Sequence, residues 1–347
     1  MANIAYEDLS GTSTPVTTNP YDGIIQACKN DPKQIQERYD LHRRTRNEKQ
    51  KEKILSPDFQ GWILDEVLTK LDGPQEDPGF MDPRNCLVFW ARPPRKIKNL
   101  IEIIQQRLKH VAPALWLMPL PNLHMTAMEV THSLTSPEID ALVQTLLPAS
   151  KTIADLPSTP GSRARLIKPQ LSFDAAALAL SFVPAAAESF PNSNLDMPRQ
   201  ASDDTFTYHH LRHTLYDMIS ATGVLIASRY VVPSAHLTIA RFNSPNPFDA
   251  ANQLDGDAGS NMAKRKQLII EVERINQWLE AEVWPGAAGG GGVMDDEETK
   301  GQTGIAGSTA QLSGQWVVGE GNGLDFRRGA LWYGGGETVY LGKGIEE

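Results

Sequence analysis

The stretches NLHMTAMEV, residues 122–130, and SAHLTIARF, residues 234–242, share one pattern around which the chain is organised. Each is an apolar, β-prone run with a His-x-Thr at its centre. The polar residues are His124 and Thr126 in the first run and His236 and Thr238 in the second. Successive side chains of a strand point to opposite faces, so the imidazole and hydroxyl of each run share one face. The sequence therefore predicts two strands that each present an imidazole beside a hydroxyl.

Two imidazoles across a cleft can supply one general base and one general acid, and two hydroxyls can bind the oxygens of a phosphate. This is the chemistry that opens a phosphodiester without a metal. A reference pKa near 6.5 for both imidazoles predicts a bell-shaped rate with its maximum near neutrality. A single His-x-Thr is weak evidence, because each histidine can equally be an ordinary strand residue. The pair is more specific, since both follow a proline-containing approach, MPLPN and VVPSA.

The pair resembles the signature of the two-histidine (2H) phosphoesterase superfamily. LHMTAME and HLTIARF are most similar to a fungal branch of RNA ligase/cyclic nucleotide phosphodiesterase-like proteins, and the resemblance covers about residues 84–345. It implies a bilobal α+β fold of two antiparallel sheets with helices outside. Each sheet is expected to donate one His-x-Thr to a central cleft.

The resemblance also implies an enzyme that hydrolyses 2′,3′-cyclic phosphate on nucleotides or RNA ends. We expect His236 to take a proton from water or a ribose hydroxyl and His124 to protonate the leaving ribose oxygen, an assignment that the sequence alone does not fix. Thr126 and Thr238 are expected to hold the phosphoryl oxygens. Two alternatives stay open: an RNA-end exonuclease or ADP-ribose cyclic phosphodiesterase of the same superfamily, and a non-catalytic RNA-binding or scaffold protein with the same fold.

The composition of the chain limits the kinds of molecule that it is expected to bind. The chain has 347 residues and a net charge of −9, which argues against a broad duplex-binding surface, because such surfaces are rich in Lys and Arg. A nucleotide or a single RNA end fits better. Only Cys28 and Cys86 are present, so neither a disulfide framework nor a Cys-rich zinc site is predicted, and we expect no metal or cofactor.

The beginning MANIAYEDLSGTSTP lacks the basic and apolar regions of a secretory signal. No apolar run approaches the ~18 residues that span a membrane. We therefore expect a cytoplasmic or nuclear protein without a membrane partner.

The chain divides into an N-terminal extension, residues 1–80, and a 2H phosphoesterase-like domain, residues 81–347. The extension is predicted to be partly helical, with a charged helix over residues 31–54 that has Pro32 in its first turn and a second helix that starts at Ser56. The basic run of the first helix could contact RNA, although a solvated helix face is favoured. The Gly-rich insertion at 286–311 is expected to be flexible.

Three further features invite a functional role. Tyr230 lies shortly before the second motif and could stack a base, with core packing as the alternative. Arg241 is a tempting phosphate ligand, but strand alternation turns it away from His236 unless a β-bulge intervenes. His209 and His213 lie one helical turn apart; a metal site there is disfavoured because no supporting ligand motif is present.

Overall fold

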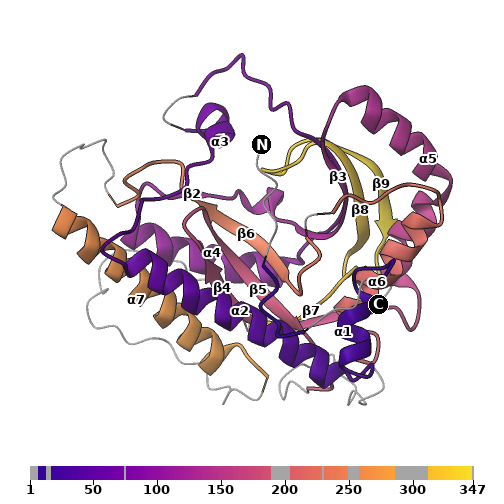
Figure 1. Cartoon of the computed structure of the whole chain (residues 1–347), viewed down its shortest axis with the longest axis horizontal. Coiled ribbons are helices and arrows are strands. Elements are labelled where there is room, and N and C mark those ends of the chain that lie inside the picture. The colour runs from indigo at the N-terminus through magenta and orange to yellow at the C-terminus, as the bar shows by residue number, and fades with distance from the viewer. Residues whose placement is uncertain are drawn as a thin grey trace, which may run out of the picture.

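The computed structural model describes residues 7–12, 17–73, 76–188, 204–228, 230–248, 258–285 and 312–345. Its strands form two antiparallel sheets, one with the order β3-β1-β8-β9 and one with the order β2-β6-β5-β4-β7. Helices lie on the outer faces of both sheets (Figure 1). This confirms the predicted bilobal α+β fold. The predicted flexibility of the insertion at 286–311 concerns residues outside those described.

The first sheet joins strands from distant parts of the chain. It comprises β1 (Asn85–Ala91), β3 (Met125–Leu134), β8 (Asn322–Ala330) and β9 (Glu337–Lys343). Strand β1 is a continuous apolar run, buried on both faces, and it pairs with β3 on one side and with β8 on the other. The C-terminal hairpin therefore completes the sheet that carries the first motif.

The second sheet carries the second motif on β6. It comprises β2 (Trp116–Leu117), β4 (Arg165–Phe173), β5 (Ala177–Pro184), β6 (Ala235–Arg241) and β7 (Trp316–Val317). Strands β4 and β5 form the predicted hairpin. Its turn is closed by Asp174, whose carboxylate accepts hydrogen bonds from the main-chain N–H groups of Ala176 and Ala177.

The helices cover the sheets from outside. They are α1 (Asp22–Ala27), α2 (Pro32–Leu55), α3 (Glu66–Leu71), α4 (Arg95–Val111), α5 (Ser136–Ala154), α6 (Tyr208–Ser220) and α7 (Ala258–Glu282), with short 3₁₀ turns η1 (Leu120–Asn122) and η2 (Leu156–Ser158). Helix α5 packs on the first sheet, whereas α2 and α7 pack on the second. In the described residues, no helix has the length and apolar character that a bilayer span requires.

Helices α4 and α6 cross between the lobes. Helix α4 follows a strand of the first sheet yet packs against β6 and α7, and α6 precedes β6 yet packs against β3 and α5. An apolar stripe at helical spacing, which includes Ile97, Ile101 and Leu108, makes α4 bury one face completely. Burying each such side chain stabilises the fold by about 2 kcal/mol. Because α4 and α6 each pack against the other lobe, the two motif strands share one hydrophobic core.

Helix α2 belongs to the same core, although its sequence is charged on all sides. Ile35 and Tyr39 are buried among residues of the sheets. Its basic side chains are largely occupied within the fold: Arg46 is ion-paired with Asp174, and Lys51 with Glu273 of α7. The basic run is therefore a solvated face only in part: Arg44 and Lys49 are exposed, whereas Arg43 is buried. The boundary expected at residue 80 stays a prediction.

The helix predicted from Ser56 is wrong for its first ten residues, because α3 covers only Glu66–Leu71. Its N-cap is Asp65, whose carboxylate accepts hydrogen bonds from the first turn. The preceding segment stays extended since Trp62 stacks on Phe242, with ring centres 3.9 Å apart. Tertiary burial of one indole thus outweighs the local helix signal.

Candidate active site

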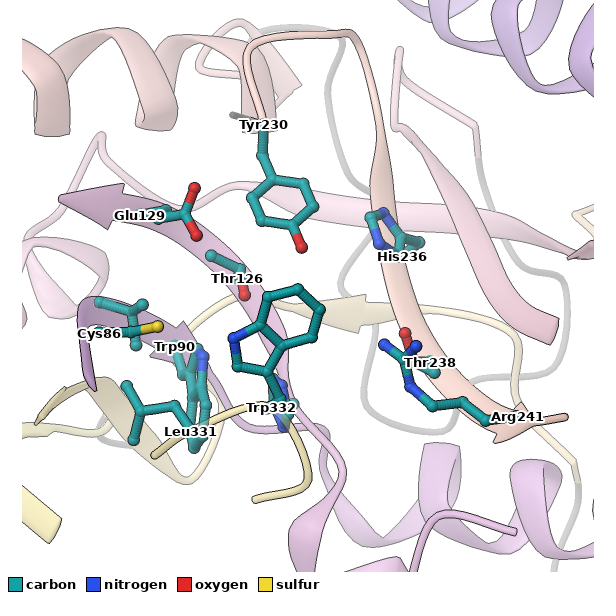
Figure 2. Close-up of a pocket in the computed structure, with 12 residues that line it drawn as sticks. Cys86, Trp90, Thr126, Glu129, Tyr230, His236, Thr238, Arg241, Leu331 and Trp332 are labelled. Carbon is teal, nitrogen blue, oxygen red and sulfur yellow. The ribbon is translucent and has the colours of Figure 1, made fainter. Parts of the chain in front are cut away.

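The two motif strands belong to different sheets, yet they lie side by side and face one pocket (Figure 2). The four motif residues and Tyr230 line it: His124, Thr126, Tyr230, His236 and Thr238. The structure therefore brings together residues that lie more than a hundred positions apart in the chain. The space open to water-sized groups measures about 60 Å³, enough for one end of a molecule but not for a duplex.

His124 is fixed on both sides of its ring. Its Nδ1 donates a hydrogen bond to the main-chain carbonyl of Asn122 at 2.8 Å, a contact that the turn η1 makes possible. The indole of Trp90 stacks on the imidazole, with ring centres 3.8 Å apart and planes inclined by 17°. Because a carbonyl can only accept, Nδ1 must carry a proton, and Nε2 is left for a ligand.

Burial lowers the pKa of His124 to about 3, and the positive charges of Arg92 and Arg241 act in the same direction. The Asn122 carbonyl opposes this effect, because it stabilises a protonated Nδ1. The imidazole is therefore neutral at pH 7 when the pocket holds no ligand. The positive charges around it also make this end of the pocket attractive to an anion.

His236 is held in a related but looser way. Its Nδ1 lies 2.9 Å from the hydroxyl of Ser234, which can donate or accept, so either neutral tautomer is satisfied. Burial lowers the pKa of His236 to about 4, assisted by the positive charges of Arg46 and Arg212. Both imidazoles are thus neutral near pH 7 in the ligand-free protein, which moves the predicted rate maximum to lower pH.

The hydroxyls of Thr126 and Thr238 make no hydrogen bond to any described residue, and the same holds for Nε2 of both imidazoles. Both threonines are half-buried at the pocket wall. Polar atoms that converge on one pocket and lack partners within the described chain are available to a ligand. Their mixture of hydroxyls and imidazoles suits a phosphate.

A β-bulge brings Arg241 into the pocket. Leu178 pairs with Ala240 and Ala179 with Thr238, so Ile239 is an extra residue on β6. The bulge reverses the alternation beyond Thr238, and Arg241 lines the pocket rather than facing away. Strand alternation alone therefore missed this residue. Its Nε is buried without a hydrogen-bond partner in the described residues, while Asp65 lies 3.5 Å from its Nη1.

Strand β3 contains a bulge at the equivalent position. Phe89 pairs with Met128 and Trp90 with Thr126, which leaves Ala127 unpaired. The residue five positions after the histidine then faces the pocket in both motifs. It is arginine in the second motif and Glu129, only 3% exposed, in the first. The repeated spacing His-x-Thr-x-x-charged is the sequence signal that could have revealed both residues.

The C-terminal hairpin supports the approach to the first motif. The Asn122 side chain donates a hydrogen bond to the carbonyl of Tyr333 at 2.9 Å, while its own carbonyl holds His124. The hairpin loop after β8 also supplies Leu331 and Trp332 to the pocket wall. Asn122 therefore connects this loop directly to the first imidazole.

The N-terminal segment supports the approach to the second motif. The hydroxyl of Tyr21 donates to the carbonyl of Tyr230 at 3.4 Å, and Arg212 donates to the carbonyl of Val232 at 2.8 Å. Arg212 also donates to the Tyr21 hydroxyl at 3.0 Å. The segment that carries Tyr230 and leads into His236 is therefore held by residues from α6 and from the start of the chain.

The histidines of α6 do not converge on a metal. His209 is buried between Tyr39 and the carbonyl of Tyr21, whereas His213 contacts Asp22 at 2.8 Å. In the described part of the chain, no group of three or more His, Cys, Asp or Glu side chains is placed to hold a metal ion.

Comparisons with known proteins supply no further assignment. No protein-family model matches the chain, and no curated protein matches it. The case for a functional site therefore rests on the geometry of the pocket.

Proposed function

We propose that this protein is a metal-independent phosphodiesterase that hydrolyses 2′,3′-cyclic phosphate on nucleotides or RNA ends. The supporting observation is the convergence of two His-x-Thr motifs from different sheets on one pocket. Their Nε2 atoms and hydroxyls have no partner among the described residues, so they are available to a substrate. A cyclic phosphate needs two proton-transfer groups and donors for its free oxygens, and the pocket offers both.

In the proposed reaction, a water molecule attacks phosphorus as one imidazole takes its proton. The bond from phosphorus to one ribose oxygen breaks, and the other imidazole gives that oxygen a proton. The product is a phosphate monoester, and the net proton count is unchanged. The threonine hydroxyls and Arg241 bind the non-bridging oxygens, whose charge grows in the transition state.

The contacts of the two imidazoles favour different roles. His124 donates from Nδ1 to a carbonyl, a contact that stabilises the imidazolium, and this suits the general acid. His236 contacts a hydroxyl that accommodates a neutral ring, and this suits the general base. A bound phosphate anion offsets the positive charges nearby and raises the pKa of the imidazole beside it, so His124 can become protonated.

The first test is an activity assay on the purified full-length chain with the four 2′,3′-cyclic nucleotides, in excess EDTA. We expect hydrolysis to a single monoester isomer, unaffected by EDTA, because none of the proposed steps uses a metal. His110→Ala, an exposed residue at the end of α4, should keep the wild-type rate. Hydrolysis that EDTA abolishes and Zn²⁺ or Mn²⁺ restores argues against this mechanism.

A further inference from the structure

Arg241, the phosphate ligand proposed on the second motif, is ion-paired with one carboxylate of the described residues. Its Nη1 lies 3.5 Å from Oδ2 of Asp65. The guanidinium of Arg241 turns back toward Thr238 inside the pocket, whereas Asp65 is not part of the pocket wall (Figure 2). The side chains of Arg241 and Asp65 are only 16% and 13% exposed, so solvent and salt screen their attraction less than at an open surface.

The two oxygens of this carboxylate have different partners. Oδ1 of Asp65 accepts hydrogen bonds from the main-chain N–H groups of Val67 and Leu68, at 3.2 and 3.1 Å, and thereby caps α3. Oδ2 faces the guanidinium of Arg241. The two bonds to Oδ1 restrict rotation of the planar carboxylate, so the cap also orients Oδ2 toward the arginine.

The segment that carries this carboxylate is attached near the end of β6 at two points. Before the cap, the indole of Trp62 stacks on Phe242, which directly follows the arginine, with ring centres 3.9 Å apart. After the cap, Asp72 accepts a hydrogen bond from the indole N–H of Trp116 at 2.8 Å. Trp116 lies on β2, opposite the arginine in the register of β2 with β6. The backbone around the carboxylate is therefore held beside the arginine by contacts other than the ion pair.

A second arginine lies near Asp65 but has a carboxylate of its own. Nε and Nη2 of Arg84 each donate to Asp82 at 2.8 Å, while Nη1 of Arg84 is 3.9 Å from Asp65. Arg84 also donates to the hydroxyl of Tyr333 at 3.1 Å. Among the described carboxylates, only Asp65 lies within ion-pair distance of Arg241. The loss of Asp65 is therefore expected to affect Arg241 more than Arg84.

Building on the proposed function, we infer that Asp65 is a positioning residue for Arg241, contributed by the segment predicted from the sequence to be an N-terminal extension. A free arginine side chain populates many rotamers, so fixing it on a phosphate costs conformational entropy. With Nη1 held by Asp65, the guanidinium is oriented toward the non-bridging oxygens before the substrate binds. Because Asp65 lies outside the pocket wall, its effect on hydrolysis passes through Arg241.

The test is a double-mutant cycle of Asp65→Asn and Arg241→Gln, with kcat and KM measured for a 2′,3′-cyclic nucleotide on the full-length chain. Asparagine caps a helix as well as aspartate does, so α3 keeps its cap while the ion pair is lost. We expect Asp65→Asn to lower kcat by roughly 3- to 10-fold and to change KM by less than about twofold, because Arg241 keeps its charge but loses its orientation. In the Arg241→Gln background, the same substitution should change kcat by less than about twofold.

Asp31→Asn is the matched control, because Asp31 caps α2 in the same way and is not part of the pocket wall. It should keep the wild-type kcat. An unchanged kcat in Asp65→Asn, or an equal loss with and without Arg241, overturns the inference but not the proposed function.

Asp65→Ser, which also retains a capping oxygen, replaces the asparagine variant if that variant does not fold. Failure of both variants to fold would show that Asp65 serves the fold rather than Arg241, which overturns the inference as well. Failure of the wild type to hydrolyse any cyclic phosphate contradicts the proposed function itself.

Discussion

The two motifs have the same local design but are held in place by opposite ends of the chain. Each has a histidine anchored by a residue two positions before it, a threonine on the same face, and a bulge that turns the fifth residue into the pocket. The first motif is supported by the C-terminal hairpin, and the second by the N-terminal segment and α6. The two motifs therefore share one strand design but differ in the residues that support them. Variants at matched positions can separate the role of the His124 motif from that of the His236 motif.

The largest effect among these supporting residues is expected at Arg241. If Arg241 binds the phosphate, Arg241→Gln should lower kcat/KM by about 10²-fold, because a buried charge-assisted contact to the transition state is lost. Arg328→Gln is the control, since Arg328 is ion-paired with Glu337 outside the pocket. Steady-state kinetics on a cyclic nucleotide measures both. Equal behaviour of the two variants would remove Arg241 from the proposed site.

The support of the first motif can be broken at Gly334. Its φ of +87° lies in the left-handed region, and an added Cβ would be 2.4 Å from Cβ of Asn122. Gly334→Ala should therefore lower the free energy of unfolding by about 2–3 kcal/mol, through backbone strain plus the clash.

Gly61→Ala is the matched control for this variant. Gly61 has a φ of +97° but nothing within 4 Å of the added Cβ, so only the backbone strain of about 1 kcal/mol applies. Denaturant unfolding measures the difference. If both variants lose the same free energy of unfolding, the loop after β8 adjusts to the added Cβ at no cost and does not hold Asn122 in place.

The support of the second motif is sensitive to pH through His209. Its Nε2 donates to the carbonyl of Tyr21, Nδ1 accepts from the Tyr39 hydroxyl, and burial lowers its pKa to about 3. The unfolded chain binds a proton below pH 6.5, whereas the folded chain does not until near pH 3. The stability contributed by the neutral ring is therefore complete above pH 6.5 and declines as the pH falls.

His209→Gln should flatten this decline. The amide retains a donor and an acceptor but does not titrate, so the free energy of unfolding should fall by about 1–2 kcal/mol less between pH 6.5 and pH 5. Urea unfolding at the two pH values tests this. A slope identical to that of the wild type would mean that His209 is protonated in the folded protein.

The smallest effects separate the two anchoring residues. Ser234→Ala removes the partner of Nδ1 in His236, and we expect kcat to fall by about tenfold at most. Asn122→Ala keeps the carbonyl that holds His124 but loses the bond to Tyr333, so KM should rise more than kcat falls. Reversed patterns would show that the hairpin loop positions the imidazole rather than the substrate.

The sequence was sufficient where the signal was local and repeated. The two His-x-Thr runs, the β4–β5 hairpin and the apolar stripe of α4 follow from periodicity, and all are present, although His124 lies immediately before the first residue of β3. The bulges could not be predicted from one strand, because a bulge depends on the register with its neighbour. For that reason strand alternation predicts the wrong face for Arg241 and gives no indication of Glu129.

Contacts between residues far apart in the chain also cannot be predicted from local sequence patterns. The extended segment before α3 depends on Trp62 meeting Phe242, and the exchange of α4 and α6 between lobes depends on the whole core. The lowered pKa values of both imidazoles result from burial and from arginines distant in the chain. The lowered pKa values change the pH at which the two histidines can act as acid and base, yet the motif sequences alone do not indicate them.

The most direct test of the central claim is the pH dependence of cyclic-nucleotide hydrolysis by the wild type, His124→Ala and His236→Ala. We predict that kcat/KM of the wild type is bell-shaped with a maximum below pH 6, since both free imidazoles have lowered pKa values, and that bound phosphate shifts the kcat profile upward. Each variant should lose about 10²–10⁴ in kcat, with His124→Ala losing the alkaline limb and His236→Ala the acidic limb. Exchanged limbs would reverse the acid and base roles. Full activity in both variants would contradict the account.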